Sequence, residues 1–285
     1  MTPYHDLVRR MVGLQEEGER LALGGFGPAA APVLPDNAPK AFIFSPHPDD
    51  ECIIGALPLR LLREAGVRVV NVAVTQGSNP ARQAGRLAEL RAACEYLGFD
   101  LVQTAPNGLA GINPRSRAAD PAAWREGAAV IAGLVAEHRP RILFLPHERD
   151  WNSTHIGVHL LVTDALRQLG AEAACVTIET EFWGAMDDPN LMVEVTGEQL
   201  GDLMAATSFH VGEVQRNPYH LLLPAWMQDN VRRGGELVGG QGGTPPRWRF
   251  ATLYRLGRWN GETIEKVEPT ERMLGASTPL GPLFG

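Results

Sequence analysis

The stretch AFIFSPHPDDECIIGALPLRLLREAG, residues 41–66, joins three different sequence patterns. Ala41–Ser45 is a short and mostly apolar run of the kind found in buried strands, and residues 46–51 form a polar turn. From Cys52 to Ala65 the apolar residues recur at helical spacing, and Gly66 stands where a helix would end. Because open α/β sheets bind ligands at the carboxyl ends of their strands, a strand followed by a polar turn and a helix predicts a site at that turn.

The alternation of strand and helix continues along the chain. Further strands are expected at Val67–Val74, Asp100–Gln103, Arg141–Leu145 and Val176–Glu179, and helices at 5–23, Pro80–Leu97, Pro121–His138, His155–Leu169 and Thr196–Ala206. This pattern predicts an α/β fold with a mostly parallel sheet and right-handed crossovers. Towards the end, Gly234–Pro246 is expected to be a flexible loop, and Trp248–Leu256 a strand at a sheet edge.

Composition and charge exclude several classes of protein. The 285 residues are 44% hydrophobic and 21% charged, which is ordinary for a globular enzyme, and the net charge of −7 argues against a general binder of nucleic acid or anionic membranes. The three cysteines form no CxxC pair, so neither a disulfide framework nor a thiolate zinc site is expected. No signal peptide and no apolar run of 18 residues is recognisable, so the expected location is the cytoplasm.

The turn after the first strand carries metal-ligand side chains at a suitable spacing. His47 and Asp50 are three residues apart, and an imidazole nitrogen with a carboxylate oxygen suits zinc or a similar divalent cation. A catalytic zinc site takes three protein ligands, so a third is expected from a neighbouring strand end. His155 is the best candidate and His147 its main competitor, whereas His159, one turn further along the same helix, is expected to support the site or to pack.

Asp49 lies between the two proposed ligands and is the candidate general base. Its carboxylate could take a proton from water on the metal, whose pKa falls to roughly 7 on zinc. General-base assistance of this kind contributes ~10²–10⁴-fold. The alternative is simple helix capping, because Asp49, Asp50 and Glu51 stand where a helix N-terminus favours acidic residues.

The motif Pro46-His47-Pro48-Asp49-Asp50-Glu51 after a strand resembles the signature of the PIG-L/LmbE-like metal-dependent deacetylases, and the resemblance extends over roughly residues 40–215. It implies a Rossmann-like fold with helices on both faces of the sheet. It also implies a single metal ion, zinc with ferrous iron as the alternative, held by His47, Asp50 and His155. Asp49 would be the general base, and the reaction would remove an acetyl group from N-acetylglucosaminyl compounds.

Other positions agree with this family or depart from it. Arg86 belongs to an R-x-x-E helix and would there reach a substrate hydroxyl or anionic group, and Asp150 matches an acidic position of the second motif. Where many members have His-Pro-Asp-His, this chain has Asn152-Ser153-Thr154-His155. An asparagine can donate to an oxyanion but cannot act as an acid. The resemblance suggests His210 as the group that protonates the leaving amine instead.

Two further features have both a functional and a structural interpretation. Thr75-Gln76-Gly77-Ser78 ends the strand beside the first motif, so it is either a substrate contact or a turn from strand to loop. Trp151 and Trp183 lie near the proposed site in sequence and would either stack on a sugar ring or pack in the core.

The sequence therefore predicts a zinc-dependent N-deacetylase, an amide hydrolase acting on a small N-acetylated sugar conjugate. One domain is expected over residues 1–285, comprising an N-terminal helix and connector (1–40), a Rossmann-like core (41–180) and a C-terminal extension that completes the site (181–285). A homo-oligomer is compatible with the sequence. The alternatives are a metal-dependent hydrolase of another amide or ester, a doubly wound cofactor-binding protein without metal, and a non-catalytic metal-binding module.

Overall fold

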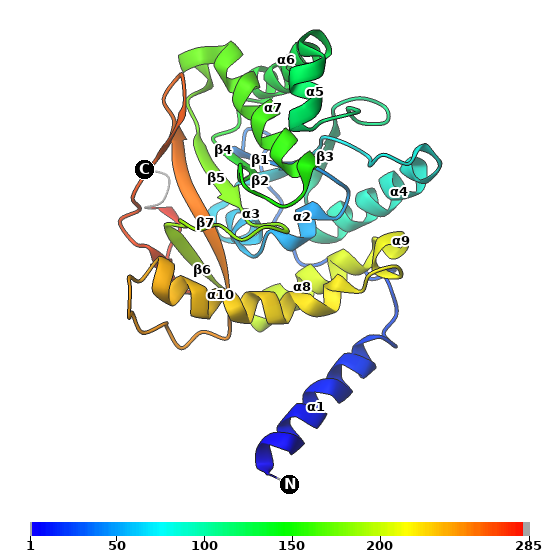
Figure 1. The fold of residues 1–285 in the computed structure, drawn as a ribbon, viewed down its shortest axis with the longest axis vertical. Coiled ribbons are helices and arrows are strands. Elements are labelled where there is room, and N and C mark those ends of the chain that lie inside the picture. The colour runs from blue at the N-terminus through cyan, green and yellow to red at the C-terminus, as the bar shows by residue number, and fades with distance from the viewer. Residues whose placement is uncertain (1, 282–285) are drawn as a thin grey trace.

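A central sheet organises the computed structural model, which describes residues 2–281. Within that range the sheet has nine strands in the order β3-β2-β1-β4-β5-β7-β6-β9, with β8 paired to β7 (Figure 1). The strands are β1 Lys40–Ser45, β2 Arg68–Ala73, β3 Asp100–Gln103, β4 Ile142–Pro146, β5 Val176–Thr180, β6 Leu191–Val195, β7 Phe250–Trp259, β8 Ile264–Lys266 and β9 Met273–Leu274. The helices are α1 Pro3–Gly18, α2 Asp50–Ile53, α3 Leu57–Ala65, α4 Pro80–Leu97, α5 Pro114–Ala119, α6 Pro121–His138, α7 Ser153–Leu169, α8 Gly197–Ser208, α9 Val211–Val214 and α10 Leu223–Leu237, with 3₁₀ helices η1 Gly170–Ala173 and η2 Tyr219–Leu222.

The first five strands are parallel, as the alternation of strand and helix predicts. β1 pairs with β2 on one side and with β4 on the other, and β3 and β5 extend the sheet outward. The strand expected at a sheet edge, Trp248–Leu256, corresponds to β7. The expected position is wrong, because β7 lies inside the sheet, antiparallel to both β5 and β6. The sequence also gave no indication of β6, which pairs with β7 over its full length.

Helices cover both faces of this sheet, which confirms the predicted fold class. Alternate side chains of β1 enter two different cores: Ala41 and Ile43 pack with residues of α3, α4 and α8, whereas Phe42 and Phe44 pack with residues of α6 and α7. Alternation with a period of two is what a strand buried on both faces requires. The burial of β1 on both sides fixes the position of its carboxyl end, where the polar turn begins.

The helix expected over Cys52–Ala65 is interrupted, and the interruption has a steric cause. α2 ends at Ile53, and α3 begins at Leu57 after Gly55, whose φ is +88°. A Cβ at Gly55 would lie 2.0 Å from Thr252 Oγ1 on β7, so only glycine allows the close approach. The Tyr254 hydroxyl then donates to the Ile54 carbonyl at 2.6 Å, which fixes the break against the sheet.

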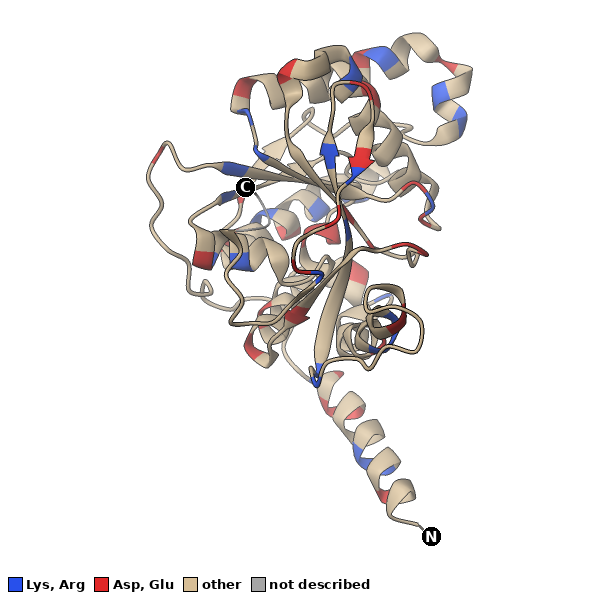
Figure 2. Ribbon diagram, turned by 90° about the vertical axis from the view of Figure 1, so that its left-hand side faces the viewer, with Lys and Arg blue, Asp and Glu red and all other residues tan. Residues whose placement is uncertain are grey.

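The N-terminal helix is set apart from the rest of the chain. α1 has no buried residue and projects from the other elements in both views (Figures 1 and 2). It carries charges of both signs, Asp6, Arg9, Arg10, Glu16 and Glu17 (Figure 2). Among residues 2–281, no helix has the length and apolar character needed to cross a membrane.

Candidate metal centre and active site

The site lies where the order of the parallel strands reverses. The chain passes from β1 to its neighbour β2 and then to β3, and later returns to the other side of β1 as β4. The carboxyl ends of β1 and β4 therefore lie together at the switch point, where doubly wound sheets bind their ligands. The turn after β1 carries His47 and Asp50, and α7, which follows β4, carries His155.

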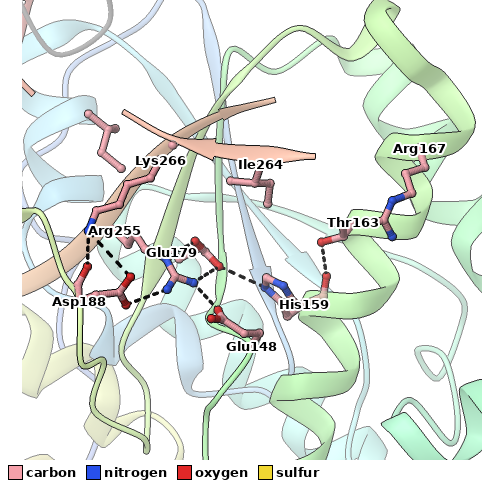
Figure 3. A pocket seen from close by; sticks show the side chains of 11 residues that line it. Glu148, His159, Thr163, Arg167, Glu179, Asp188, Arg255, Ile264 and Lys266 are labelled. Atoms are coloured by element: carbon pink, nitrogen blue, oxygen red, sulfur yellow. Dashed lines mark hydrogen bonds and ion pairs between the residues drawn. The ribbon is translucent and has the colours of Figure 1, made fainter. Parts of the chain in front are cut away.

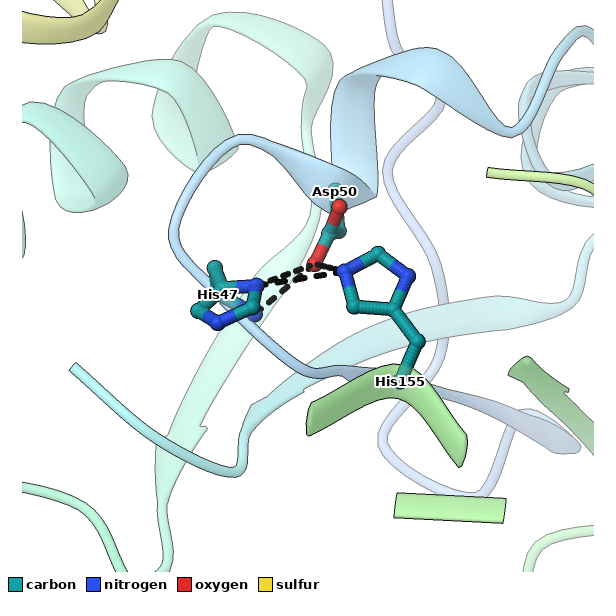
Figure 4. Close-up of side chains that lie close together, drawn as sticks. All are labelled: His47, Asp50 and His155. Carbon is teal, nitrogen blue, oxygen red and sulfur yellow. Dashed lines mark hydrogen bonds and ion pairs between the residues drawn. The ribbon is translucent and has the colours of Figure 1, made fainter. Parts of the chain in front are cut away.

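These three side chains converge, as the sequence predicts (Figure 4). His47 Nδ1 lies 3.2 Å from His155 Nε2 and 3.5 Å from Asp50 Oδ2, and Asp50 Oδ2 lies 3.3 Å from His155 Nε2. All three ligand atoms fall within 4.8 Å of one another. Asp50 and His155 are fully buried, and His47 is partly exposed.

The donor set fits a divalent cation. The Asp50 carboxylate receives one backbone hydrogen bond, from His47 N–H to Oδ2 at 2.8 Å, and its buried Oδ1 has no hydrogen-bond partner among the described residues. Burial alone would raise the pKa of Asp50, but the charges and hydrogen bonds of His155 and His47 lower it below its ordinary value, which favours the ionised form. A buried carboxylate facing two imidazole nitrogens is a set of ligands that zinc and ferrous iron both accept.

Asp150 supports His155 from behind. Asp150 Oδ1 lies 3.6 Å from His155 Nδ1 and accepts the Asn152 backbone N–H at 2.9 Å, while Oδ2 accepts the N–H groups of Trp183 and Gly184. A carboxylate beside the second nitrogen of a ligating histidine fixes the orientation of the ring. Thr154 stands where many family members have an aspartate, and in this chain the carboxylate beside His155 is that of Asp150.

Asp49 lies against the three ligands and lines an open cleft of about 390 Å³. Its φ is +116°, a strained conformation for a residue other than glycine, and its N–H donates to Glu51 Oε2 at 3.0 Å. The Tyr219 hydroxyl donates to Asp49 Oδ2 at 2.6 Å. Burial and the neighbouring charge of Asp50 raise the pKa of Asp49 to about 7, against the opposing influence of His210, Tyr219 and Arg86.

The same cleft contains His47, Arg86 and Asn152. Arg86 donates to the Pro48 carbonyl at 3.0 Å and lies 4.0 Å from Asp49 Oδ2, so it borders the site next to Asp49. Asn152 caps α7, with Oδ1 accepting the Thr154 N–H at 2.8 Å. Because this cap fixes the amide oxygen, the amide nitrogen is the group that Asn152 has available to donate.

His210, by contrast, is not brought into the cleft. It is fully buried, and its Nε2 lies 2.7 Å from Glu51 Oε1 and 3.9 Å from Cys52 Sγ. Burial lowers the pKa of His210, but the nearby carboxylates, Glu51 above all, outweigh burial and raise it, which favours the protonated ring. Since Glu51 also accepts the Asp49 N–H, His210 lies behind the turn that carries Asp49.

The two competing histidines are engaged elsewhere. His147 Nε2 contacts the Gly184 carbonyl at 2.9 Å, and its Nδ1 accepts the Arg149 N–H. His159 Nδ1 contacts the Pro146 carbonyl at 3.0 Å and lies 3.4 Å from Glu179 Oε1. His155 is therefore the histidine that joins His47 and Asp50, and His159 belongs to a second polar cluster.

That second group, here named the Arg255 cluster, is formed by side chains from α7, β5, β7 and the segments that follow β4 and β5 (Figure 3). Its members are Glu148, His159, Glu179, Asp188 and Arg255. Glu148, His159 and Glu179 could also place ligand atoms within 4.8 Å of one another. The guanidinium of Arg255, however, already pairs with Glu148, Glu179 and Asp188.

Tyr219 is the contact that sequence reasoning missed. It follows Asp49 by 170 residues and lies in a 3₁₀ helix after α9. No motif or periodicity marks the segment Asn217-Pro218-Tyr219-His220, so only the folded chain reveals that the Tyr219 hydroxyl reaches Asp49.

Comparison with known proteins gives one family and a set of similar folds. Residues 42–166 match the model of the PIG-L family, described as GlcNAc-PI de-N-acetylase, which confirms the resemblance seen in the sequence. A comparison with curated proteins finds no match.

Among solved structures, N,N'-diacetylchitobiose deacetylase from Pyrococcus horikoshii is 16% identical with a TM-score of 0.52, and the match covers 77% of this chain and 84% of that one. The zinc-inhibited form of teicoplanin deacetylase is 16% identical with a TM-score of 0.54, over 77% and 98% of the two chains. The 4-carboxy-2-hydroxymuconate hydratase of Pseudomonas putida is also 16% identical with a TM-score of 0.54, over 76% and 95%. At such identities the likeness shows a shared fold, and the proteins with this fold include a hydratase as well as deacetylases.

Proposed function

We propose that the protein is a metal-dependent N-deacetylase that releases acetate from an N-acetylglucosamine-type substrate, on the premise that residues 42–166 match the model of the PIG-L family. The observation that carries the proposal is the convergence of His47, Asp50 and His155 within 4.8 Å beside a cleft that Asp49 lines. Zinc is the proposed metal, with ferrous iron as the alternative that the same donor set accepts. When bound, the ion would lower the pKa of water and polarise the amide carbonyl.

The proposed role of Asp49 is to move the proton. It takes one proton from the attacking water as the new C–O bond forms, and it returns a proton to the nitrogen as the C–N bond breaks. Tyr219 holds Oδ2 at 2.6 Å, and Glu51 holds the backbone N–H, so the carboxylate is fixed before substrate enters. The products are acetate and a free amine.

The remaining residues have supporting roles in this proposal. The amide nitrogen of Asn152 donates to the carbonyl oxygen as it gains charge, a contribution of about 3–4 kcal/mol per well-placed donor in the best cases. Arg86 binds a polar group of the substrate at the wall of the cleft. Because His210 is buried against Glu51, its position favours support of the Asp49 turn over direct protonation of the amine.

The test replaces Asp49 with asparagine and measures acetate and free amine released from N-acetylglucosamine and its conjugates. Asp49→Asn keeps the shape of the side chain but cannot accept the proton, so kcat should fall by ~10²–10⁴-fold while bound metal, measured by elemental analysis, stays constant. Asp100→Asn, at an exposed ion pair with Arg68, is the matched control and should change neither quantity. Full activity of Asp49→Asn would contradict the assignment of the base.

The metal is tested separately. Removal of metal with a chelator should abolish activity, and addition of Zn²⁺ or Fe²⁺ should show which ion restores it. A panel of N-acyl sugars, other amides and esters distinguishes a deacetylase from a metal-dependent hydrolase of another bond. Activity that is unaffected by complete metal removal would overturn the proposal.

A further inference from the structure

The cleft beside Asp49 contains a polar group that the protein leaves unpaired. Gln76 follows β2 and lines the cleft, and only 1% of its surface is exposed. Neither its amide oxygen nor its amide nitrogen has a hydrogen-bond partner within residues 2–281. Buried amides are nearly always paired, because leaving one unpaired destabilises the folded protein. An amide kept in this state at the wall of a cleft is suited to a ligand that both donates and accepts, as a hydroxyl does.

Arginines gather on the wall next to Gln76. Arg82 and Arg86 lie one turn apart on α4, so they share a face, and Arg216 follows α9. All three guanidinium groups pair with the single carboxylate of Glu213. The buried Nε of Arg86 lies 3.6 Å from Glu213 and has no hydrogen-bond partner among the described residues.

The charge of the cleft is therefore opposite to that of the chain. Three arginines line it against two acids, Asp49 and Glu213, which leaves +1 when both acids are ionised, whereas the whole chain has a net charge of −7. Each guanidinium has five N–H donors, and one carboxylate cannot satisfy three of them. A positive cleft on an acidic protein attracts anions and is suited to charge-assisted hydrogen bonds with them.

The local backbone is adapted to this arrangement. Gly77 has a φ of +81°, and a Cβ there would lie 2.4 Å from Arg86 Nη1, so glycine leaves room for the guanidinium to lie against the end of β2. Glu89 on α4 accepts the Gly212 N–H at 2.9 Å, which ties the start of α9 to α4. Helix α9, which carries Glu213, is thus held beside α4, which carries Arg82.

From these observations we infer that the cleft has an anion subsite formed by Arg82 and Arg216, with Gln76 beside it for a neighbouring hydroxyl. The substrate would be a polyhydroxy compound that bears a phosphate or a carboxylate in addition to the acylated amine. This inference rests on the proposed function for the acyl group, but the anion subsite depends only on the arginines and Gln76.

The test compares kcat/KM for N-acetylglucosamine with that for its 1-phosphate, its 6-phosphate and N-acetylmuramic acid, which carries a carboxylate. The wild type should prefer at least one anionic substrate by roughly 10- to 100-fold, as expected for charge-assisted hydrogen bonds. Arg82→Gln and Arg216→Gln should each remove most of that preference through KM, with little change for the neutral sugar. The substrate that loses most identifies phosphate or carboxylate as the ligand.

Arg232→Gln is the matched control for Arg216→Gln. Arg232 is also an exposed arginine paired with an acid three residues away, Asp229, but it does not line the cleft. It should leave all rates unchanged. Equal rates for neutral and anionic sugars in the wild type, or equal losses for both in the arginine variants, would overturn the anion subsite.

Direct binding separates this inference from the proposed function. Titration of inorganic phosphate and of malonate into the metal-loaded protein should show binding that weakens about tenfold or more in Arg82→Gln. If no N-acetyl sugar is hydrolysed but this binding is present and lost in the variant, the deacetylase proposal fails and the anion subsite stands. If neutral sugars are deacetylated and neither anion binding nor anion preference is seen, the subsite fails alone.

Gln76→Met tests the unpaired amide. Replacing an unsatisfied buried polar group with an apolar one of similar size should preserve or raise Tm while KM for the sugars rises. A side chain with only a structural role would instead lose Tm and leave KM unchanged, and that result would remove Gln76 from the subsite.

Discussion

Two of the three groups within residues 2–281 that could bring metal-ligand atoms of histidine and acidic side chains together differ in the source of their positive charge. In the first, His47, Asp50 and His155 bring three ligand atoms together at the carboxyl ends of β1 and β4. In the Arg255 cluster, Glu148, His159 and Glu179 do the same beside β4 and β5. Ligand atoms therefore converge to a similar degree in both places, and convergence alone does not distinguish a metal centre.

The difference lies in what satisfies the carboxylates. Arg255 donates from Nε and Nη2 to the two oxygens of Glu179 at 2.6 and 2.8 Å, and from Nη1 to Asp188 at 2.9 Å. Asp50 has no such partner: it receives one backbone N–H, and its buried Oδ1 has no hydrogen-bond partner in the described part of the chain. A buried charge must be paired or must bind a metal. The Arg255 cluster carries its own cation, whereas the Asp50 site is suited to one from outside.

The largest expected effect is the loss of metal from the first cluster when Asp50 is replaced. Asp50→Asn keeps the size of the side chain but removes the charge that attracts a cation. Bound metal, measured by elemental analysis, should fall from about one ion per chain to a trace, and activity should fall with it. The loss of affinity should exceed the roughly 10- to 100-fold typical for partners of metal ligands, because Asp50 is proposed as a ligand itself.

Glu179→Gln provides the matched control in the Arg255 cluster. It also removes one negative charge from a buried acid, but the guanidinium there excludes a metal, so metal content should stay constant. Loss of metal in Glu179→Gln with retention in Asp50→Asn would reverse the assignment of the two clusters.

Sequence reasoning could reach the first cluster because its information is mostly local. His47, Asp49 and Asp50 stand in one turn after a strand, and the alternation of strand and helix places a second strand end nearby. The third ligand required a choice between His147 and His155, which the position of His155 at the start of a helix decided. The family resemblance suggested the deacetylation reaction, and the match of residues 42–166 to the PIG-L family model confirms that resemblance.

The rest depended on pairings between segments far apart in the chain. Arg255 lies on β7, which was expected at an edge and instead lies between β5 and β6. An antiparallel strand inserted between distant partners leaves no periodic signal of its neighbours. For the same reason the sequence did not show that Tyr219 reaches Asp49, or that Thr252 forces the break in the helix at Gly55.

The next effect concerns stability at the Arg255 cluster. Arg255→Met removes the internal cation and leaves Glu179, which is 3% exposed, buried without its partner. Breaking a buried pair in this way costs about 3–5 kcal/mol, so the free energy of unfolding measured with denaturant should fall by that order. Arg149→Met is the control, because that arginine is exposed and its closest ion pair, with Asp187 at 3.1 Å, is exposed as well, so its loss should change stability by ~0–1 kcal/mol. Equal stabilities of the two variants would show that Arg255 does not hold the cluster together.

The smallest expected effect is a dependence of stability on pH at the rim of the same cluster. Partial burial would raise the pKa of Glu148, but the hydrogen bond and charge of Arg255 outweigh it and hold the pKa at about 2. A depressed pKa stabilises the folded protein above the ordinary value of about 4.3, and this contribution is lost as pH falls towards 2. The free energy of unfolding of Glu148→Gln should therefore lie below that of the wild type at pH 6, and the gap should narrow between pH 5 and 3.

The gap should be small, because the Glu148 side chain is 39% exposed and solvent and salt screen its charge. Other carboxylates with lowered pKa values, such as Asp150 and Asp164, reduce the stability of both proteins in acid, so only the difference between the two reports on Glu148. In an Arg255→Met background, the gap between Glu148→Gln and its parent should no longer narrow between pH 5 and 3 as it does in the wild type, since the cation that contributes most to lowering the pKa of Glu148 is gone and burial raises that pKa. A gap that stays constant with pH in the wild-type background would mean that Arg255 and Glu148 are not coupled, and that the internal cation acts on Glu179 and Asp188 alone.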